Sequence, residues 1–190
     1  MSTPLERLGE WFGEAVAAGL PEPEAMALAT ATPDGVPSVR IVLMKGIDDR
    51  GVRFFTNYES RKGRELEANP RAAATLYWQP LARAVRLEGT VEPLSPAESD
   101  AYYASRPVGS RLGAWASAQS TVIESREVLL ARLADAEARY GDDPPRPGYW
   151  GGFRLVAEVV ELWQGREDRL HDRERWVLSG GAWRSERLSP

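Results

Sequence analysis

Residues 25–57, AMALATATPDGVPSVRIVLMKGIDDRGVRFFTN, decide the fold that we expect for this chain. They divide into three short runs rich in apolar residues, at 25–31, 37–45 and 51–57. The turn-forming sequences Pro33-Asp34-Gly35 and Asp48-Asp49-Arg50-Gly51 separate these runs. Apolar runs of this length joined by tight turns are typical of antiparallel strands connected as hairpins.

The same pattern continues toward the C-terminus. Further strands are expected at 71–78, 83–94, 153–165, 172–179 and 182–188. Helices are expected at 5–18, 60–70, 95–105 and 121–141. Ser60 and Ser95 are the expected N-caps of two of them, and Pro96 and Glu98 complete a capping box after Ser95. Together these elements predict an α+β fold that is mainly antiparallel β, a sheet or barrel with helices packed around it.

The composition is that of one globular domain. Of the 190 residues, 43% are hydrophobic and 27% are charged, a balance that supports a hydrophobic core without disulfides. We therefore expect a single domain over 1–190, with an N-terminal helix within 1–20 and C-terminal strands within 150–190.

Counts of rare residues and motifs exclude several kinds of site. There is no cysteine and one histidine, His171, so thiol chemistry and the HExxH metal motif are excluded and no metal site is expected. Neither a GxGxxG fingerprint nor a GxxxxGK[ST] loop is present. The net charge of -4 argues against nucleic acid as a partner. Because no apolar stretch approaches the ~20 residues of a spanning helix and no signal peptide is visible, we expect a cytoplasmic protein without membrane association.

The segment TNYESRK, residues 56–62, places two cations where a helix begins. Helix N-termini carry partial positive charge and free N–H groups, so acidic residues are the usual choice there. Here the first turn holds Arg61 and Lys62, next to the hydroxyls of Thr56 and Ser60. Two interpretations are open: a phosphate bound by these groups, or a charged turn in solvent.

The run RIVLMK, residues 40–45, is an apolar strand with a cation at each end and is expected to be buried. Lys45 and Lys62 are the two lysines of the chain, against 22 arginines. Because side chains alternate along a strand, Arg40 and Lys45 face opposite sides unless Lys45 lies past the strand end or a bulge redirects it. The alternative is that both are strand-end charges that reach solvent.

The C-terminal segment WQGREDRLHDR, residues 163–173, gathers positive charge. If residues 169–173 are extended, Arg169, His171 and Arg173 share one face of a strand. One interpretation is an anion bound between them, with Trp163 stacking on a ring. The other is a solvated edge strand whose charge is balanced by Glu167, Asp168 and Asp172.

Two further groups carry candidate donors. Tyr102, Arg106 and Ser110 are four residues apart, so they share one side of a helix unless Pro107 ends it. Gln119 and Ser120 follow a predicted bend, where Ser120 is also a candidate N-cap of the long helix. The expected apolar stripe of that helix consists of Ile123, Leu129, Leu130 and Leu133.

Taken together, these segments resemble the pyridoxamine 5′-phosphate oxidase family. The segments that carry the resemblance are RIVLMK, FFTNYESRKG, YYASRP, GAWASAQST, RLHDR and the C-terminal RLSP, between about residue 22 and the C-terminus. The resemblance implies an FMN-binding split β-barrel and a homodimer with two active sites at the subunit interface. It also implies that pyridoxamine or pyridoxine 5′-phosphate is oxidised to pyridoxal 5′-phosphate while O2 is reduced to hydrogen peroxide, by hydride transfer from the C4′ carbon to the flavin.

The matching positions imply a set of site residues. FMN would be held by Arg40, Lys45, Phe55, Thr56, Ser60, Arg61 and Lys62, and from elsewhere in the dimer by Gln119, Ser120, Trp163 and Arg173. The phosphorylated pyridine substrate would be held by Lys45, Tyr102, Arg106, Ser110, Arg169 and His171. Arg169 and His171 would be the catalytic residues, which orient the amine or alcohol, and the strands of 150–190 would complete the site.

One position departs from the family. Ala84 stands where relatives usually have a flavin-contacting glutamine, and we expect Arg86, Gln119 or water to replace the lost contact. Two other functions stay open on the same fold. One is a related FMN-dependent oxidase of another ring substrate, of the dihydrophenazine type. The other is a non-catalytic flavin- or heme-binding protein.

Overall fold

The structure is a computed structural model that describes residues 2–190, so Met1 of the expected segment 1–20 lies outside the described residues. Its strands are β1 (Ala25–Ala31), β2 (Pro37–Leu43), β3 (Gly46–Ile47), β4 (Gly51–Asn57), β5 (Arg71–Trp78), β6 (Arg83–Pro93), β7 (Trp150–Gln164), β8 (Asp172–Ser179) and β9 (Ala182–Arg187). Its helices are α1 (Pro4–Ala17), α2 (Arg61–Ala68), α3 (Pro96–Ser105), α4 (Val108–Ala116) and α5 (Arg126–Tyr140), with short 3-10 turns η1 (Gln79–Leu81) and η2 (Glu167–Arg169).

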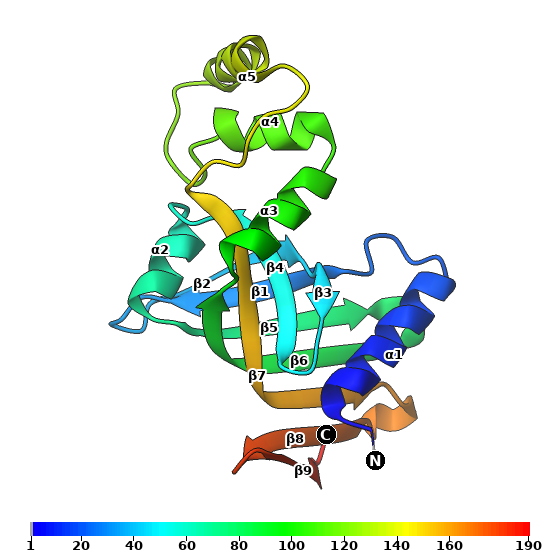
Figure 1. Cartoon of the computed structure of the whole chain (residues 1–190). Helices are drawn as coiled ribbons and strands as arrows, with labels where there is room; N and C mark the ends of the chain where they lie inside the picture. The colour runs from blue at the N-terminus through cyan, green and yellow to red at the C-terminus, as the bar shows by residue number, and fades with distance from the viewer. Residues whose placement is uncertain (1) are drawn as a thin grey trace.

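One curled sheet contains all of these strands. Its order is β2-β1-β5-β6-β7-β4-β3, with the β8–β9 hairpin attached to β7, and the paired strands are antiparallel (Figure 1). The long strand β7 pairs with β4 through its first half and with β8 through its second half, while β6 lies along its other side. The α+β fold that is mainly antiparallel β, expected from the sequence, is therefore confirmed, and its sheet forms a curled half-barrel.

The core lies inside the curl of the sheet. Alternation brings Leu28, Leu76 and Leu87 of three neighbouring strands to the inner face, where each is fully buried. Helix α1 covers part of this face with Leu5 and Leu8, and the expected amphipathic helix is confirmed. The expected caps at Ser60 and Ser95 are also confirmed, the latter as a capping box with Glu98.

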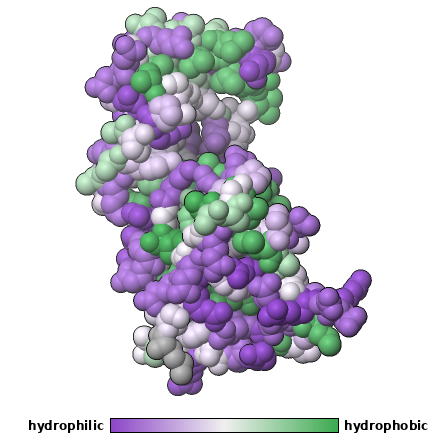
Figure 2. All heavy atoms as spheres, turned by 90° about the vertical axis from the view of Figure 1, so that its right-hand side faces the viewer, coloured by the Kyte–Doolittle hydropathy of each residue, from purple (hydrophilic) through white to green (hydrophobic). Residues whose placement is uncertain are grey.

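The last three helices form an upper lobe above one end of the sheet (Figure 1). The long helix was expected from 121, but α5 begins at Arg126, and Ser120 has a φ of 70° and does not cap it. The expected apolar stripe of this helix does not form a buried face, because Ile123 lies before the helix and the Leu130 side chain is 50% exposed. Figure 2 shows hydrophobic residues gathered on this upper lobe.

Strand β2 is an edge strand, and the prediction that it is buried was wrong. Val39 and Ile41 are 69% and 65% exposed, because alternate side chains of β2 point to a face of the sheet that no other element of residues 2–190 covers. Of the alternatives for Lys45, the structure supports a position past the strand end, because β2 ends at Leu43. None of the helices found within residues 2–190 is long and apolar enough to cross a membrane.

Candidate active site

The first turn of α2 turns Lys62 toward the interior of the molecule. The Ser60 hydroxyl accepts a hydrogen bond from the Gly63 N–H at 3.3 Å, which fixes the start of the helix. Gly63 is required there, since a Cβ at this position would lie 1.9 Å from the Tyr58 carbonyl oxygen. Lys62 is consequently 7% exposed, although it belongs to a segment of strongly polar residues.

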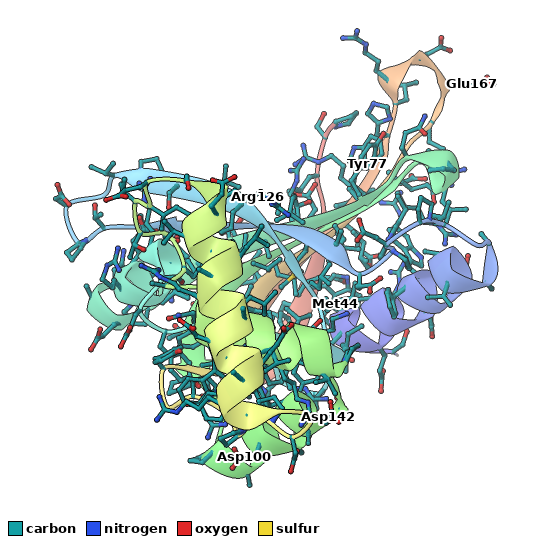
Figure 3. The ribbon with its side chains drawn as sticks, turned by 90° about the horizontal axis from the view of Figure 1, so that it is seen from above. Met44, Tyr77, Asp100, Arg126, Asp142 and Glu167 are labelled. Carbon is teal, nitrogen blue, oxygen red and sulfur yellow. The ribbon has the colours of Figure 1, made fainter. Side chains whose placement is uncertain are left out.

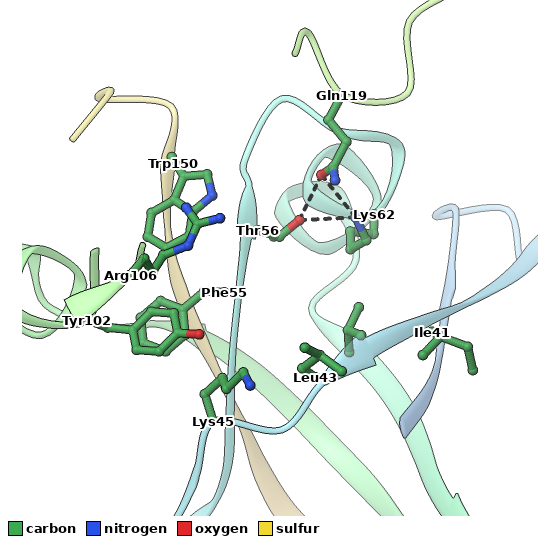
Figure 4. Close-up of a pocket in the computed structure, with 11 residues that line it drawn as sticks. Ile41, Leu43, Lys45, Phe55, Thr56, Lys62, Tyr102, Arg106, Gln119 and Trp150 are labelled. Carbon is green, nitrogen blue, oxygen red and sulfur yellow. Dashed lines mark hydrogen bonds between the residues drawn. The ribbon is translucent and has the colours of Figure 1, made fainter. Parts of the chain in front are cut away.

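Lys62 is a buried cation whose partners are neutral. Its Nζ donates to Thr56 Oγ1 at 3.0 Å and to Gln119 Oε1 at 3.2 Å (Figure 4). It also donates to Ser60 Oγ at 3.4 Å. Burial, with a smaller contribution from the nearby Arg40 guanidinium, lowers the pKa of Lys62 to about 8. A bound anion would stabilise the charged form of Lys62.

The carboxylate of Glu65 pairs with two arginines of this region, Arg40 and Arg61. The buried Glu65 carboxylate accepts from Arg61 Nε at 2.8 Å and from Arg40 Nη2 at 3.2 Å. Although burial alone would raise it, hydrogen bonds from Ser38, Thr30 and Arg61 hold the pKa of Glu65 at about 2. Contrary to the sequence argument about the basic first turn, Arg61 therefore does not need an external anion. The argument still applies to Lys62, whose partners are neutral.

A cavity of 260 Å³ opens beside Lys62, between β2, β4, α3 and the start of β7. Its lining includes the predicted residues Lys45, Phe55, Thr56, Lys62, Tyr102, Arg106 and Gln119 (Figure 4). The Phe55 and Tyr102 rings stack with centroids 3.8 Å apart, and Trp150 stacks on Phe55 at 5.7 Å. The cavity thus combines a flat aromatic wall with cations at separate positions.

Arg106 lies between this cavity and a second one of 300 Å³, which also contains Ser110. Its guanidinium lies over the Trp150 ring, 4.6 Å from the centroid. The Nη1 atom of Arg106 is buried and has no hydrogen-bond partner among the described residues. Burial lowers the pKa of Arg106 from its usual value. An unpartnered buried guanidinium is costly unless a ligand supplies the missing acceptor.

A third hollow of 400 Å³ adjoins the first and is lined by Arg40, Arg61 and Ser120, with Lys62 and Gln119 shared between the two. The structure therefore brings together the predicted residues from 40 to 120, with Ser60 beneath Lys62. Gln119 contacts Thr56 and Lys62 of its own chain, although it was expected from elsewhere in the dimer.

The predicted C-terminal residues lie away from these cavities. Arg169 and His171 line none of the three, and Glu167 of η2 and Asp100 of α3 lie at opposite ends of the view from above (Figure 3). Residues 169–173 are not one extended strand, because Arg169 belongs to η2 and has a φ of 61°, and β8 starts at Asp172. The prediction that Arg169, His171 and Arg173 share one strand face was therefore wrong.

Three of these C-terminal residues nevertheless form a local cluster. The Trp163 and His171 rings lie 4.7 Å apart, and Trp163 is paired across the sheet with Arg173. His171 Nδ1 accepts a hydrogen bond from the Arg166 N–H at 3.1 Å. Arg173 donates to the buried Glu161 carboxylate at 2.8 and 3.1 Å. The cluster is a second, separate half of the predicted site within this chain.

Ala84 lies next to this cluster on the outer face of the sheet. It is paired with Tyr77 of β5 on one side and with Trp163 of β7 on the other. Arg86, the expected substitute for the family glutamine, contacts Glu161 at 3.3 Å. Glu161 thus engages both Arg86 and Arg173.

Sequence reasoning missed two residues that shape the site. Trp150 lines two of the cavities, but the Pro/Gly-rich residues before it made 141–152 look like a loop. Glu65 was missed because its partner Arg40 is 25 positions away in the sequence. The first turn of α2 contains no acidic residue. This lack of a local partner for Arg61 was the signal in the sequence that pointed to Glu65.

Comparisons with known proteins find a family match for each of two parts of the chain. A family described as "Pyridoxamine 5'-phosphate oxidase" matches residues 12–140, and "Pyridoxine 5'-phosphate oxidase C-terminal dimerisation region" matches residues 150–190. A protein from Paraburkholderia phymatum named pyridoxine/pyridoxamine 5'-phosphate oxidase is 60% identical over 188 residues, which cover 98% of this chain and 89% of that protein. One of the same name from Burkholderia lata is 57% identical, covering 98% and 89%.

Solved structures give the same result for the fold. PhzG from Burkholderia lata 383, in complex with tetrahydrophenazine-1-carboxylic acid, has a TM-score of 0.95 at 39% identity and covers 100% of this chain and 94% of that chain. A pyridoxamine 5'-phosphate oxidase-related, FMN binding protein from Nostoc punctiforme has a TM-score of 0.74 at 20% identity, covering 95% and 97%. On the two family matches and these identities, the chain belongs to the pyridoxamine 5′-phosphate oxidase family, a family of flavin-dependent oxidoreductases.

Proposed function

We propose that this protein is an FMN-dependent oxidase that converts pyridoxamine or pyridoxine 5′-phosphate to pyridoxal 5′-phosphate, with O2 reduced to hydrogen peroxide. The observation that carries the proposal is a pair of cations, Lys62 and Arg106, on one aromatic-walled cavity. Neither has an acidic partner, and Arg106 Nη1 has no partner at all among residues 2–190. Two such cations fit two phosphates, one on the cofactor and one on the substrate.

The residues around Lys62 fit the phosphate of FMN. Lys62 Nζ lies 3.0 Å from the Thr56 hydroxyl and 3.4 Å from the Ser60 hydroxyl. Arg61 uses its Nε for Glu65, so its two Nη groups stay available beside the 400 Å³ hollow. Bound FMN would supply the two-electron acceptor of the reaction. One phosphate site for the cofactor, at Lys62, and the absence of a dinucleotide motif favour FMN over FAD.

The residues around Arg106 fit the phosphate of the substrate. Tyr102 lines the first cavity, Ser110 lines the second, and Arg106 lies between them. The Lys45 ammonium, which contacts Glu24 at 3.2 Å, stands at the other side of the first cavity. These groups would orient the substrate with its phosphate toward α3 and α4.

The C-terminal cluster completes the site from the partner subunit of a homodimer. Support comes from the matched dimerisation region at 150–190 and from the exposed apolar residues Val39 and Ile41 on β2 beside the cavity. Because Nδ1 of His171 accepts a backbone N–H, the neutral ring carries its proton on Nε2. His171 would therefore offer the substrate an N–H donor, and Arg169 would offer a cation.

A test of the shared site uses mixed dimers. Lys62→Met removes a group from the cavity half, and His171→Ala removes one from the C-terminal half. If each site combines halves from two chains, a mixed dimer contains one site without either substitution. Refolding the two variants together should then raise oxidase activity above that of either variant refolded alone. Activity that stays absent in verified mixed dimers would show that each chain builds its own site.

The second candidate is an oxidase of a dihydrophenazine-type ring, which the likeness to PhzG favours. One observation weighs against it. Identity to the Burkholderia lata protein named pyridoxine/pyridoxamine 5'-phosphate oxidase is 57%, against 39% for PhzG from the same species. Arg106 does not separate the two substrates, because a guanidinium pairs with a carboxylate as well as with a phosphate. Product analysis with each substrate, measuring pyridoxal 5′-phosphate and hydrogen peroxide, separates the two functions.

A further inference from the structure

Arg106 differs from other arginines of the predicted site in how it is held. Arg40 and Arg173 direct their N–H edges to the buried carboxylates of Glu65 and Glu161. The Arg106 guanidinium lies over the Trp150 ring at 4.6 Å and over the Tyr103 ring at 5.8 Å, and its Nη1 has no hydrogen-bond partner among the described residues. Contact with the face of an aromatic ring needs no acceptor oxygen, so the N–H groups stay free for another partner.

Trp150 is itself fixed from several sides. It stacks on Phe55 at 5.7 Å and meets Tyr103 edge-on at 5.1 Å, and it is 7% exposed. Its backbone is anchored where β7 begins, because its N–H donates to Pro147 O at 3.0 Å and its carbonyl accepts from Arg146. The ring therefore forms a rigid platform at the boundary of the two cavities.

We propose that Trp150 is a positioning residue that holds Arg106 by its face, so that the N–H edge of Arg106 stays open for the phosphate of the substrate. A carboxylate partner would compete with that phosphate, whereas an aromatic face stabilises the cation without using its donors. Trp150 is thereby a determinant of selectivity for phosphorylated over unphosphorylated substrates. This inference rests on the proposed function in so far as it names the substrate.

The test compares Trp150→Leu, which removes the aromatic face, with Trp150→Phe, which keeps a weaker one. Trp115→Leu is the matched control, because Trp115 packs on Tyr140 in the same lobe and lines none of the three cavities. We measure KM and kcat for pyridoxine 5′-phosphate and FMN affinity. We also measure the dissociation constant of inorganic phosphate for the FMN-loaded protein by calorimetry, which does not depend on turnover.

In Trp150→Leu we expect KM and the phosphate dissociation constant to rise on the order of 10-fold, with kcat and FMN affinity within about 2-fold. Trp150→Phe should recover most of this loss, and Trp115→Leu should leave both constants unchanged. If pyridoxine 5′-phosphate is not oxidised but phosphate binding follows this pattern, the proposed function fails and the role of Trp150 stands. Unchanged phosphate binding in Trp150→Leu, or equal losses in Trp150→Phe and Trp150→Leu, would overturn the role of Trp150.

Discussion

Replacing Lys62 by methionine should stabilise the flavin-free protein at pH 7 while it weakens FMN binding. Burial lowers the pKa of Lys62 from 10.5 to about 8, and each pKa unit corresponds to about 1.4 kcal/mol. Keeping the charge buried therefore costs the folded state about 3 kcal/mol below pH 8. Methionine fills a similar volume without a charge.

The hydrogen bonds lost with Lys62 offset only part of this gain. Thr56 still donates to Gln119 at 3.0 Å, and Ser60 still accepts from Gly63, so neither hydroxyl is left without a partner. Counting about 0.5 kcal/mol for each of the three lost bonds subtracts about 1.5 kcal/mol and leaves a net stabilisation of about 2 kcal/mol for Lys62→Met at pH 7.

Urea unfolding of the flavin-free proteins at pH 7 and pH 9.5 measures this difference. In the folded wild type Lys62 loses its proton above pH 8, whereas in the unfolded chain it keeps it up to about 10.5. The cost therefore falls as pH rises through this window, and the advantage of Lys62→Met should shrink by about 2 kcal/mol at pH 9.5. FMN affinity at pH 7 should fall roughly 10- to 100-fold, as expected for a lost charge-assisted hydrogen bond. A variant that is less stable than wild type, or whose advantage does not change with pH, would refute the reasoning.

Three further predictions follow from the site. Arg169→Ala should weaken the binding of pyridoxine 5′-phosphate by about 2 kcal/mol or more, which is measured as a higher KM. Stability and FMN affinity should stay nearly unchanged, because Arg169 is exposed. Equal losses of FMN and substrate affinity in titrations would mean that Arg169 has been assigned to the wrong ligand. Ala84→Gln should be tolerated and leave FMN affinity unchanged or modestly tighter, as judged by flavin fluorescence titration, whereas loss of flavin binding would mean that the space between Tyr77 and Trp163 is filled in the dimer. Mass spectrometry of the released cofactor should find FMN, and finding FAD would contradict the single phosphate site at Lys62.

The strands and caps could be predicted because their signals are local. Turn residues between short apolar runs place β1, β4 and β5 at the expected residues, and Ser60 and Ser95 cap the helices that follow them. The start of β7 at Trp150 was missed because proline and glycine precede it and the strand is stabilised by pairing with β4, a distant partner. Tertiary pairing of this kind leaves no trace in neighbouring residues.

The sequence shows which charged residues the site contains, but it does not show which of them pair with each other. Nothing near Arg40 in the sequence indicates that Glu65 neutralises it, since the pairing depends on how α2 packs against β1. The alternation argument for Arg169 and His171 failed because η2 interrupts the chain with a positive φ at Arg169. The exposure of Val39 on β2 likewise depends on which face of the sheet is covered by other elements.

Anaerobic mixing of the FMN-loaded protein with pyridoxine 5′-phosphate tests the central claim most directly. The proposed oxidase should lose the absorbance of its oxidised flavin as the substrate is converted, and admitting O2 should restore the absorbance and release hydrogen peroxide. Unphosphorylated pyridoxine should act far more weakly, because it leaves Arg106 Nη1 without an acceptor. Flavin that stays oxidised with pyridoxine 5′-phosphate but is reduced by a dihydrophenazine carboxylic acid would contradict the proposed function.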